Sequence, residues 1–348
     1  MELSGSRMRA AIFDAETRRV SIETLPIPRP GPDELLVKVC RCGVCGSDVA
    51  KTSDGPYPFR TGRFGHEYAG EVLEVGRDVV GHKPGDRIAA FPVVACGTCG
   101  ICREGGHPFL CEARKSASQG FGEYAVLPAK AAIPLPQSLS LADGALVEPM
   151  ACGLHAMNVA NVRSGARVLV LGAGSMALSA IYWAHQLGAG RVGVLSRSPH
   201  RAEMAMAMGA DTVLGFDADE RARVHDALGG PADIVCECVG KAGMIDLAVE
   251  LVRPAGTVVS MGMCMQTEPL LPAKCAYKEA RLVFPLGYTV DEFVQTARAM
   301  DAGSLQAEPM VSEVISLEDL PARLEAMRAG RGGGLKLHVD LSRSAADA

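Results

Sequence analysis

Between Ala166 and Met261 the chain alternates short apolar runs with segments of helical periodicity. The apolar runs are VLVL, VGVL, IVCEC and TVVSM, and helix patterns near 176–187, 200–208 and 243–252 lie between or beside them. Strands and helices that alternate in this order are joined by crossovers, so the strands run parallel. The sequence therefore predicts an α/β fold with a doubly wound parallel sheet.

The segment VLVLGAGSMALSA joins the first predicted strand to a predicted helix in a G-x-G-x-x-A spacing. Glycines at this turn let the backbone approach a pyrophosphate, which then lies at the positive end of the helix. A plain strand-to-helix turn would show similar glycines, but the surrounding strand and helix units favour dinucleotide binding. The predicted cofactor-binding residues of this loop are Gly172, Gly174, Ser175, Met176 and Ala177.

The second strand of this region ends in VLSRSPHR. Ser196 stands where an enzyme that prefers NAD has an acidic residue, and Arg197 and Arg201 follow it. Arginine near this point favours the 2′-phosphate of NADP. The alternative is a basic helix start that faces solvent and binds no phosphate. We predict NADP as the cofactor, with NAD possible.

A chain of 348 residues is long for a single core, and it predicts two domains. Residues 8–150 contain short β-like runs with Gly and Pro between them, and the irregular segment after Gly287 is too short for a domain of its own. We therefore predict one domain from residues 1–155 and 288–348, and a dinucleotide-binding domain from residues 156–287.

The composition predicts a small-molecule partner. A net charge of -5 without runs of like charge argues against nucleic acid and anionic membranes. The N-terminus has no signal-peptide pattern, and no run of 18 apolar residues occurs, so we expect a cytoplasmic protein. Thiols stay reduced in that compartment, and closely spaced cysteines are then more often metal ligands than disulfides.

The stretch ACGTCGICREGGHPFLC holds four cysteines: three in a C-x2-C-x2-C pattern and a fourth after eight intervening residues. Four thiolates can enclose one Zn²⁺ tetrahedrally and leave no position open for a substrate. The alternative is four thiols clustered by accident. The sequence predicts a structural zinc bound by Cys96, Cys99, Cys102 and Cys111.

A second set of candidate ligands is dispersed along the chain. The motifs CGVCGSD, GHEYAG and LVEPMAC contain Cys45, His66, Glu67 and Glu148. One thiolate, one imidazole and one carboxylate leave a fourth zinc position for water or substrate. Each residue alone could instead be a buried thiol, a core histidine or a helix-start acid. Asp48 could accept the spare N–H of His66.

These motifs carry a family resemblance. The segment GHEYAGEVLEVGRDV, followed by KPGDRI, resembles the zinc signature of the medium-chain dehydrogenase/reductase family, and the likeness spans nearly the whole chain. The resemblance implies a GroES-like catalytic domain whose sequence is interrupted by a Rossmann domain. It also implies that Cys45 and His66 bind catalytic zinc, with Glu67 adjacent or exchanging and Ser47 relaying the substrate proton. Glu148 is similar to the glutamate of polyol and threonine dehydrogenases.

Three departures from the family pattern affect this assignment. The last structural cysteine follows eight residues rather than seven, so the loop should bulge at Gly105 and Gly106. Ala50 stands where some members carry a relay histidine. Cys152, four residues after Glu148, could replace it as a ligand if the segment is helical.

The predicted activity is reversible oxidation of a secondary alcohol or polyol, with zinc as Lewis acid and a nicotinamide as hydride acceptor. A zinc-free quinone or enone reductase and a non-catalytic dinucleotide-binding scaffold are the alternatives. We expect a homodimer or homotetramer, with the strand TVVSMGMCM pairing with its copy. Cleft residues near Tyr57, Phe64, Phe121 and residues 264–288 are predicted to set substrate specificity.

Overall fold

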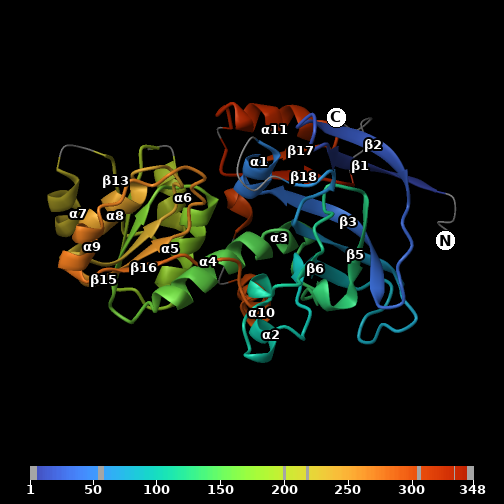
Figure 1. The fold of residues 1–348 in the computed structure, drawn as a ribbon, viewed down its shortest axis with the longest axis horizontal. Helices are drawn as coiled ribbons and strands as arrows, with labels where there is room; N and C mark the ends of the chain where they lie inside the picture. Colours follow the sequence, from blue (N-terminus) through green and yellow to red (C-terminus); the bar gives the residue numbers. More distant parts are fainter. Residues whose placement is uncertain are drawn as a thin grey trace. The chain divides into compact units, whose positions relative to one another are not determined.

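Figure 1 shows a computed structural model of the chain, which describes residues 6–53, 59–198, 201–216, 219–303, 307–332 and 334–342. The chain forms two compact units, Met1–Glu148 with Thr289–Ala348, and Pro149–Tyr288. Among the described residues, no helix has the length and apolar character needed to cross a bilayer.

The first unit is mainly β-structure. Its strands are β1 (Arg7–Phe13), β2 (Val20–Pro26), β3 (Glu34–Val44), β4 (Gly62–Arg63), β5 (Glu67–Val75), β6 (Arg87–Ala90), β7 (Val93–Val94), β8 (Lys115–Ser116), β9 (Tyr124–Pro128), β10 (Ala132–Pro134), β17 (Val311–Ile315) and β18 (Lys336–Asp340). Its helices are α1 (Gly46–Thr52), α2 (Gly100–Arg103), α3 (Leu141–Gly144), α10 (Val290–Asp301) and α11 (Leu320–Arg328), with short 3-10 turns η1 (Pro108–Leu110), η2 (Ala129–Ala131) and η4 (Glu308–Met310).

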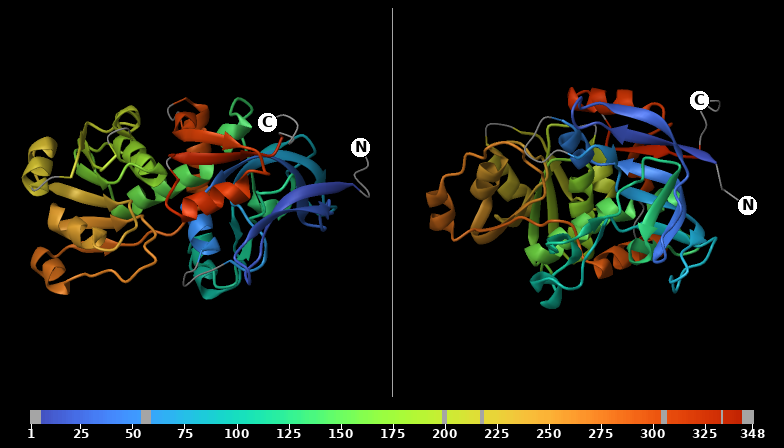
Figure 2. Two further views of the ribbon diagram at one scale, coloured as in Figure 1. Left: turned by 90° about the horizontal axis from the view of Figure 1, so that it is seen from above. Right: turned by 45° about the vertical axis from the view of Figure 1, so that its right-hand side comes forward.

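The long strand β3 organises this unit. The main sheet has the order β10-β6-β5-β3-β18-β17, and β9 also pairs with β3. The C-terminal strand β18 runs antiparallel to β3, with Val339 opposite Cys42, so the two ends of the sequence share one sheet. Figure 2 shows this in colour, with the red C-terminal strands beside the blue N-terminal ones.

The apolar faces of β3, β5 and β9 supply the core of the first unit. Alternate residues of these strands point inward, and Leu35, Val37, Val72 and Leu127 are fully buried. Removal of this apolar surface from water is the main stabilising term for the sheet.

The second unit contains the predicted parallel sheet. Its strands are β11 (Arg167–Leu171), β12 (Arg191–Leu195), β13 (Thr212–Leu214), β14 (Ala232–Glu237), β15 (Val252–Ser260) and β16 (Arg281–Val283). They lie in the order β13-β12-β11-β14-β15-β16, and every pair is parallel. The predicted doubly wound α/β fold is confirmed.

Helices cover both faces of this sheet (Figure 1). They are α5 (Ser175–Gln186), α6 (Ala202–Ala207), α7 (Glu220–Leu228), α8 (Met244–Leu251) and α9 (Pro272–Lys278), while α4 (Val147–Ala160) begins at the boundary between the units. The strand residues between the helix layers, such as Leu169, Val235 and Val258, are almost fully buried. Burial on both faces explains the continuous apolar runs in the sequence.

Some elements were not predicted. The helix α7 has the polar sequence ERARVHDAL, so its apolar periodicity is weak. Its end signals were readable: the Asp219 side chain accepts a hydrogen bond from the Ala222 amide, and Gly229 ends the helix in the left-handed region. Helix α11 was missed as well, although its buried Leu320 and Leu324 lie four residues apart.

The predicted pairing of TVVSMGMCM with its copy is wrong in detail. Strand β15 has β14 on one side, and its residues Thr257 to Val259 pair with Arg281 to Val283 of β16 on the other. Its backbone donors and acceptors are therefore already used inside the sheet. The edge strand on this side of the sheet is β16.

His338 on β18 predicts a pH dependence of stability. The side chain is 1% exposed, and neither ring nitrogen has a hydrogen-bond partner among the described residues. Burial and the nearby Lys336 and Arg41 lower the pKa of His338 to about 3. The unfolded chain therefore binds a proton below about pH 6.5 that the folded chain excludes.

From pH 8 to pH 5 this difference should lower the free energy of unfolding by about 2 kcal/mol. We expect His338→Leu to remove that part of the pH dependence, measured by urea unfolding of both proteins at the two pH values. Equal pH dependence in the variant and the parent would contradict the assignment.

Candidate active site

Cys45 lies where β3 ends and α1 begins. Its Sγ accepts a hydrogen bond from the Ser47 amide at 3.4 Å, and its own amide donates to Asp48 Oδ2 at 2.9 Å. The two contacts form a capping box, which satisfies amides that the first turn of a helix leaves without partners. The backbone therefore fixes the position of the thiol at the helix start.

His66 reaches the same place from the neighbouring strand. It precedes β5, whose residue Glu67 pairs with Gly43 of β3. The preceding Gly65 has φ of +93°, and a Cβ on it would lie 2.6 Å from the Phe121 ring, so only glycine fits there. Sheet register and this turn together bring His66 beside Cys45.

The three side chains form a cluster suited to a cation. Ligand atoms of Cys45, His66 and Glu67 all lie within 4.8 Å of one another. His66 Nδ1 is 3.4 Å from Oδ1 of the fully buried Asp48, so Nε2 is left for a metal, as expected for the predicted role of Asp48.

The electrostatics of the cluster agree with this geometry. Burial lowers the pKa of His66, but the neighbouring Asp48 and Cys45 outweigh burial and raise it well above the usual value. Asp48 and Cys45 therefore create a negative potential at His66, and this potential favours a bound positive charge. Sulfur, nitrogen and carboxylate oxygen are ligands that zinc accepts, so the residues present fit the metal that was predicted.

Glu67 has a second partner that sequence reasoning missed. Lys336 Nζ lies 2.7 Å from both Oε1 and Oε2 of Glu67, and both side chains are almost fully buried. A Cβ at Gly43 would lie 2.2 Å from Glu67 Oε2, so this glycine leaves room for the carboxylate. Burial lowers the pKa of Lys336, but the negative charge of Glu67 outweighs burial and raises this pKa above its usual value. The lysine therefore stays charged.

Glu148 is the remaining predicted ligand of the catalytic zinc. It lies at the start of α4 and is 6% exposed. Among the described residues, the group that could hold a metal here consists of Cys45, His66 and Glu67, without Glu148. It is close enough to act on the pKa of Lys336 through its charge. The structure therefore gathers two of the three predicted catalytic ligands, together with Glu67.

The four cysteines of the predicted structural site converge. Cys96, Cys99, Cys102 and Cys111 form one group, and the Sγ to Sγ distances recorded between members are 3.4 to 3.9 Å. Zinc–sulfur bonds of about 2.3 Å in a tetrahedron place sulfurs about 3.8 Å apart. The cysteines are free thiols. The arrangement fits a closed zinc site, whereas a disulfide would need contact at about 2 Å.

Local hydrogen bonds prepare the Cys96 thiol for a metal. The Thr98 hydroxyl and amide, together with the Cys99 amide, donate to Cys96 Sγ and lower the pKa of its thiol. The extra residue of this loop is accommodated as expected. Gly105 has φ of +79°, and a Cβ on Gly106 would lie 2.4 Å from the Ile101 side chain.

We expect Cys99→Ser to release one of two zinc ions and to lower the melting temperature by several degrees. Metal binding at a structural site stabilises the fold. The effect should stay moderate because this loop lies outside the main core and can unfold locally. Metal analysis and thermal unfolding would measure both effects. Unchanged zinc content in Cys99→Ser would contradict the assignment.

The predicted dinucleotide loop joins β11 to α5. Gly172 has φ of +103°, and Gly174 is the residue before the helix, which no side chain caps. A Cβ on Gly174 would meet no atom within 4 Å, so the space before the helix is open. Ser175 and Met176 occupy the first turn, while Ala177 is fully buried against the sheet. The helix N-terminus is thus available to an anion.

The residues expected to select the dinucleotide follow β12. Ser196 is 7% exposed, and its hydroxyl accepts a hydrogen bond from the Ser198 amide at 3.1 Å. Arg197 is exposed and Arg201 is half-buried. No carboxylate occupies the position where an enzyme that prefers NAD would have one.

Two residues named in the specificity prediction are buried. Phe64 and Phe121 are 2% and 0% exposed and pack edge to face with ring centroids 5.0 Å apart in the core of the first unit. They are therefore core residues of this unit, and the prediction that specificity residues lie near them stays a prediction. Tyr57 lies outside the described residues.

Two family models match the sequence. An alcohol dehydrogenase GroES-like domain matches residues 31–137, and a zinc-binding dehydrogenase domain matches residues 172–302. Sorbitol dehydrogenase of Bacillus subtilis (strain 168) is 30% identical, and the match covers 95% of this chain and 97% of that protein.

Solved structures agree with these matches. A zinc-binding dehydrogenase of Sinorhizobium meliloti 1021 bound to NADP has a TM-score of 0.85 and 29% identity, covering 96% of this chain and 99% of that one. The 2R,3R-butanediol dehydrogenase of Bacillus subtilis has a TM-score of 0.85 and 28% identity, with the same coverage of both chains.

One unit has a parallel sheet with a glycine loop, and the other is β-rich with two groups of metal-ligand residues. Together these features define a class of oxidoreductase that uses a nicotinamide dinucleotide and zinc. The chain belongs to the zinc-dependent medium-chain dehydrogenase/reductase family of alcohol and polyol dehydrogenases. It is an NAD(P)-dependent alcohol dehydrogenase that acts on a small molecule, and the resemblance found in the sequence is confirmed.

Proposed function

We propose that this enzyme oxidises a secondary hydroxyl of a polyol, or reduces the matching ketone, at a zinc site built from Cys45 and His66. The observation that carries the proposal is the convergence of Cys45, His66 and Glu67 within 4.8 Å. Zinc in this site supplies a Lewis acid for the substrate oxygen, and the nicotinamide supplies the hydride acceptor.

The chain's own residues prepare this site. Asp48 faces His66 Nδ1 at 3.4 Å and so orients Nε2 toward the thiol of Cys45. Ser47 lies in the first turn of α1, beside the thiol, and its hydroxyl would accept the substrate proton. Because Ala50 offers no imidazole, the proton would pass from Ser47 to water or to the ribose of the dinucleotide.

The remaining ligand is a choice between carboxylates. We propose Glu148 as the third ligand, as in the polyol dehydrogenases that the sequence resembles. Glu67 would then stay paired with Lys336 and off the metal. Exchange of Glu67 onto the metal would require its pair with Lys336 to open. Cys152 as a substitute for Glu148 stays a prediction.

A polyol substrate is supported by the relatives. The similar protein of Bacillus subtilis is named a sorbitol dehydrogenase, and the similar structure from that organism is a butanediol dehydrogenase. Both names describe substrates with more than one hydroxyl group. We propose the same substrate class here, with residues 1–155 and 288–348 as the catalytic domain and 156–287 as the dinucleotide domain.

We propose NADP as the preferred dinucleotide, because Ser196 replaces an acid and Arg197 follows it. Arg197→Ala should raise the KM for NADP by about tenfold and leave the KM for NAD nearly unchanged, since a charged hydrogen bond to the phosphate is worth about 1.5 kcal/mol or more. Steady-state kinetics with both dinucleotides would test this. A parent enzyme that prefers NAD would contradict it.

We further propose a cytoplasmic homo-oligomer. Strand β16 is an edge strand of its sheet, and Phe284 and Leu286 just beyond it are 65% and 46% exposed. A second copy could pair along this edge and cover both side chains.

The deciding experiment is a substrate panel with the zinc-loaded enzyme. Diols, polyols, amino alcohols and aromatic alcohols would each be supplied with NADP and with NAD, and nicotinamide absorbance would report hydride transfer. We expect turnover with polyols or diols that is lost after chelation and restored by Zn²⁺. Turnover of quinones or enones alone, without dependence on zinc, would contradict the proposal.

A further inference from the structure

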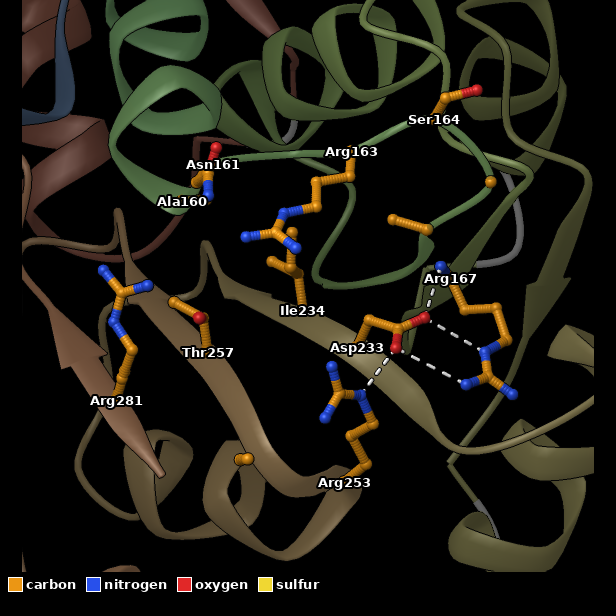
Figure 3. Close-up of a pocket in the computed structure, with 13 residues that line it drawn as sticks. Ala160, Asn161, Arg163, Ser164, Arg167, Asp233, Ile234, Arg253, Thr257 and Arg281 are labelled. Carbon is orange, nitrogen blue, oxygen red and sulfur yellow. Dashed lines mark hydrogen bonds and ion pairs between the residues drawn. The ribbon is translucent and has the colours of Figure 1, made fainter. Parts of the chain in front are cut away.

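The second unit has a pocket at the edge of its sheet where the strands begin (Figure 3). Its volume is about 590 Å³, within the range of small-molecule sites. We call it the strand-start pocket; its polar and charged lining comes from Asn161, Arg163, Ser164, Arg167, Asp233, Arg253, Thr257 and Arg281.

The parallel topology explains why arginines meet here. Arg167 and Arg281 are the first residues of β11 and β16, and Arg253 is the second residue of β15. Parallel strands begin at the same edge, so these side chains converge although they are distant in sequence. Arg163 reaches the pocket from the loop before β11, and Figure 3 shows its guanidinium directed into the hollow.

The charge of the pocket is not balanced. Asp233 contacts two arginines: Arg167 Nε donates to its Oδ2 at 3.1 Å, and Arg253 Nε donates to its Oδ1 at 2.6 Å. Burial raises the pKa of Asp233, but the hydrogen bonds from these arginines outweigh burial and lower it to about 2. The carboxylate is therefore ionised throughout the working pH range, and it neutralises one of the two arginines.

Arg163 and Arg281 add two further positive charges. Both are exposed, and neither guanidinium group has a hydrogen bond or ion pair among the described residues. Four guanidinium groups face a single carboxylate, in a chain whose acidic residues outnumber its basic ones by 40 to 35. Such a local excess of like charge opposes folding, and a ligand of opposite charge is its physical complement.

We propose that the strand-start pocket binds a small phosphorylated anion, recognised by Arg163, Arg253 and Arg281. Guanidinium groups match phosphate oxygens with paired N–H donors, and a phosphate ester or diphosphate brings the two or more negative charges that the pocket lacks. The hydroxyl of Thr257, which lies between these arginines in Figure 3, offers another donor.

This site is separate from the dinucleotide loop. Gly172 follows the last residue of β11, whereas Arg167 is its first. Five strand residues at about 3.3 Å each place the two edges roughly 16 Å apart. A phosphorylated ligand in the pocket would therefore not occupy the dinucleotide pyrophosphate site. The inference does not depend on the substrate proposed above.

Calorimetric titration of the zinc-loaded full chain with inorganic pyrophosphate tests the proposal. Saturating NADP in the cell and syringe keeps the dinucleotide loop filled, and ionic strength is held constant. We expect one binding event per chain. The double variant Arg163→Ala/Arg281→Ala should weaken it by at least about tenfold, because each guanidinium contributes charged hydrogen bonds.

The matched control is Arg221→Ala, which removes an exposed arginine of α7 in the same unit, outside the pocket lining. It should bind pyrophosphate as the parent does. The double variant should keep the parent's circular dichroism and turnover, since neither residue packs in a core or touches the catalytic cluster. A charge-reversing variant, Arg163→Glu, should abolish binding even if alanine substitutions are tolerated.

Three outcomes would overturn the proposal. The first is that pyrophosphate does not bind once NADP is saturating. The second is that the double variant and Arg163→Glu bind it as tightly as the parent. The third is that citrate binds as tightly as pyrophosphate, which would show that the pocket does not select phosphate.

Discussion

Cys45→Ser is expected to reduce kcat by about a thousandfold or more, since the Lewis acid that its thiolate helps to hold stabilises the transition state by several kcal/mol. The fold should survive the substitution. Cys45 caps α1, and serine is a favourable capping residue, so the helix start keeps its hydrogen bond. Steady-state kinetics, zinc analysis and thermal unfolding would measure activity, metal content and stability separately.

Cys40→Ser provides the matched control. Cys40 lies on β3, five residues before Cys45, and it belongs to neither group of metal-ligand residues. Its variant should keep full activity and two zinc ions. If Cys45→Ser retained parental turnover, or if it lost stability as Cys99→Ser does, the division into a catalytic and a structural zinc site would be wrong.

Lys336→Met is expected to lower the free energy of unfolding by about 3–5 kcal/mol, because it leaves the carboxylate of Glu67 buried without its charged partner. Methionine has a similar volume, so lost packing contributes little. Urea unfolding of the zinc-loaded protein would measure the change.

The double variant Lys336→Met/Glu67→Leu should recover most of that loss, since neither charge is then left buried. Arg323→Met is the control: it breaks the more exposed pair of Arg323 with Glu313 and should cost at most about 1 kcal/mol. A loss in Lys336→Met no larger than that of Arg323→Met would show that the buried pair does not hold the site together.

Much of the fold followed from local patterns. The strands β11, β12, β14 and β15 were readable because both faces of each strand are buried, which produces apolar runs. The helix α7 and the outer strand β16 were not readable. The helix is mostly polar and the strand has three residues, so neither shows a clear apolar periodicity.

The candidate metal residues were also accessible to sequence reasoning, since cysteine and histidine in dense motifs have few other uses in a reducing compartment. Lys336 was not. It stands in an ordinary closing strand, and its partner Glu67 is 269 residues away. Phe64 and Phe121 resemble pocket residues in sequence, but their rings pack against each other in the core.

The sequence by itself determined the parallel sheet, the glycine loop and the residue types that can bind zinc, because each depends on neighbours within a few turns of chain. Tertiary structure alone decided which charges meet. The pairing of β18 with β3 places Lys336 on Glu67, and the common starting edge of parallel strands gathers the arginines of the strand-start pocket. Contacts between distant segments depend on sheet order and register, which local sequence patterns do not encode.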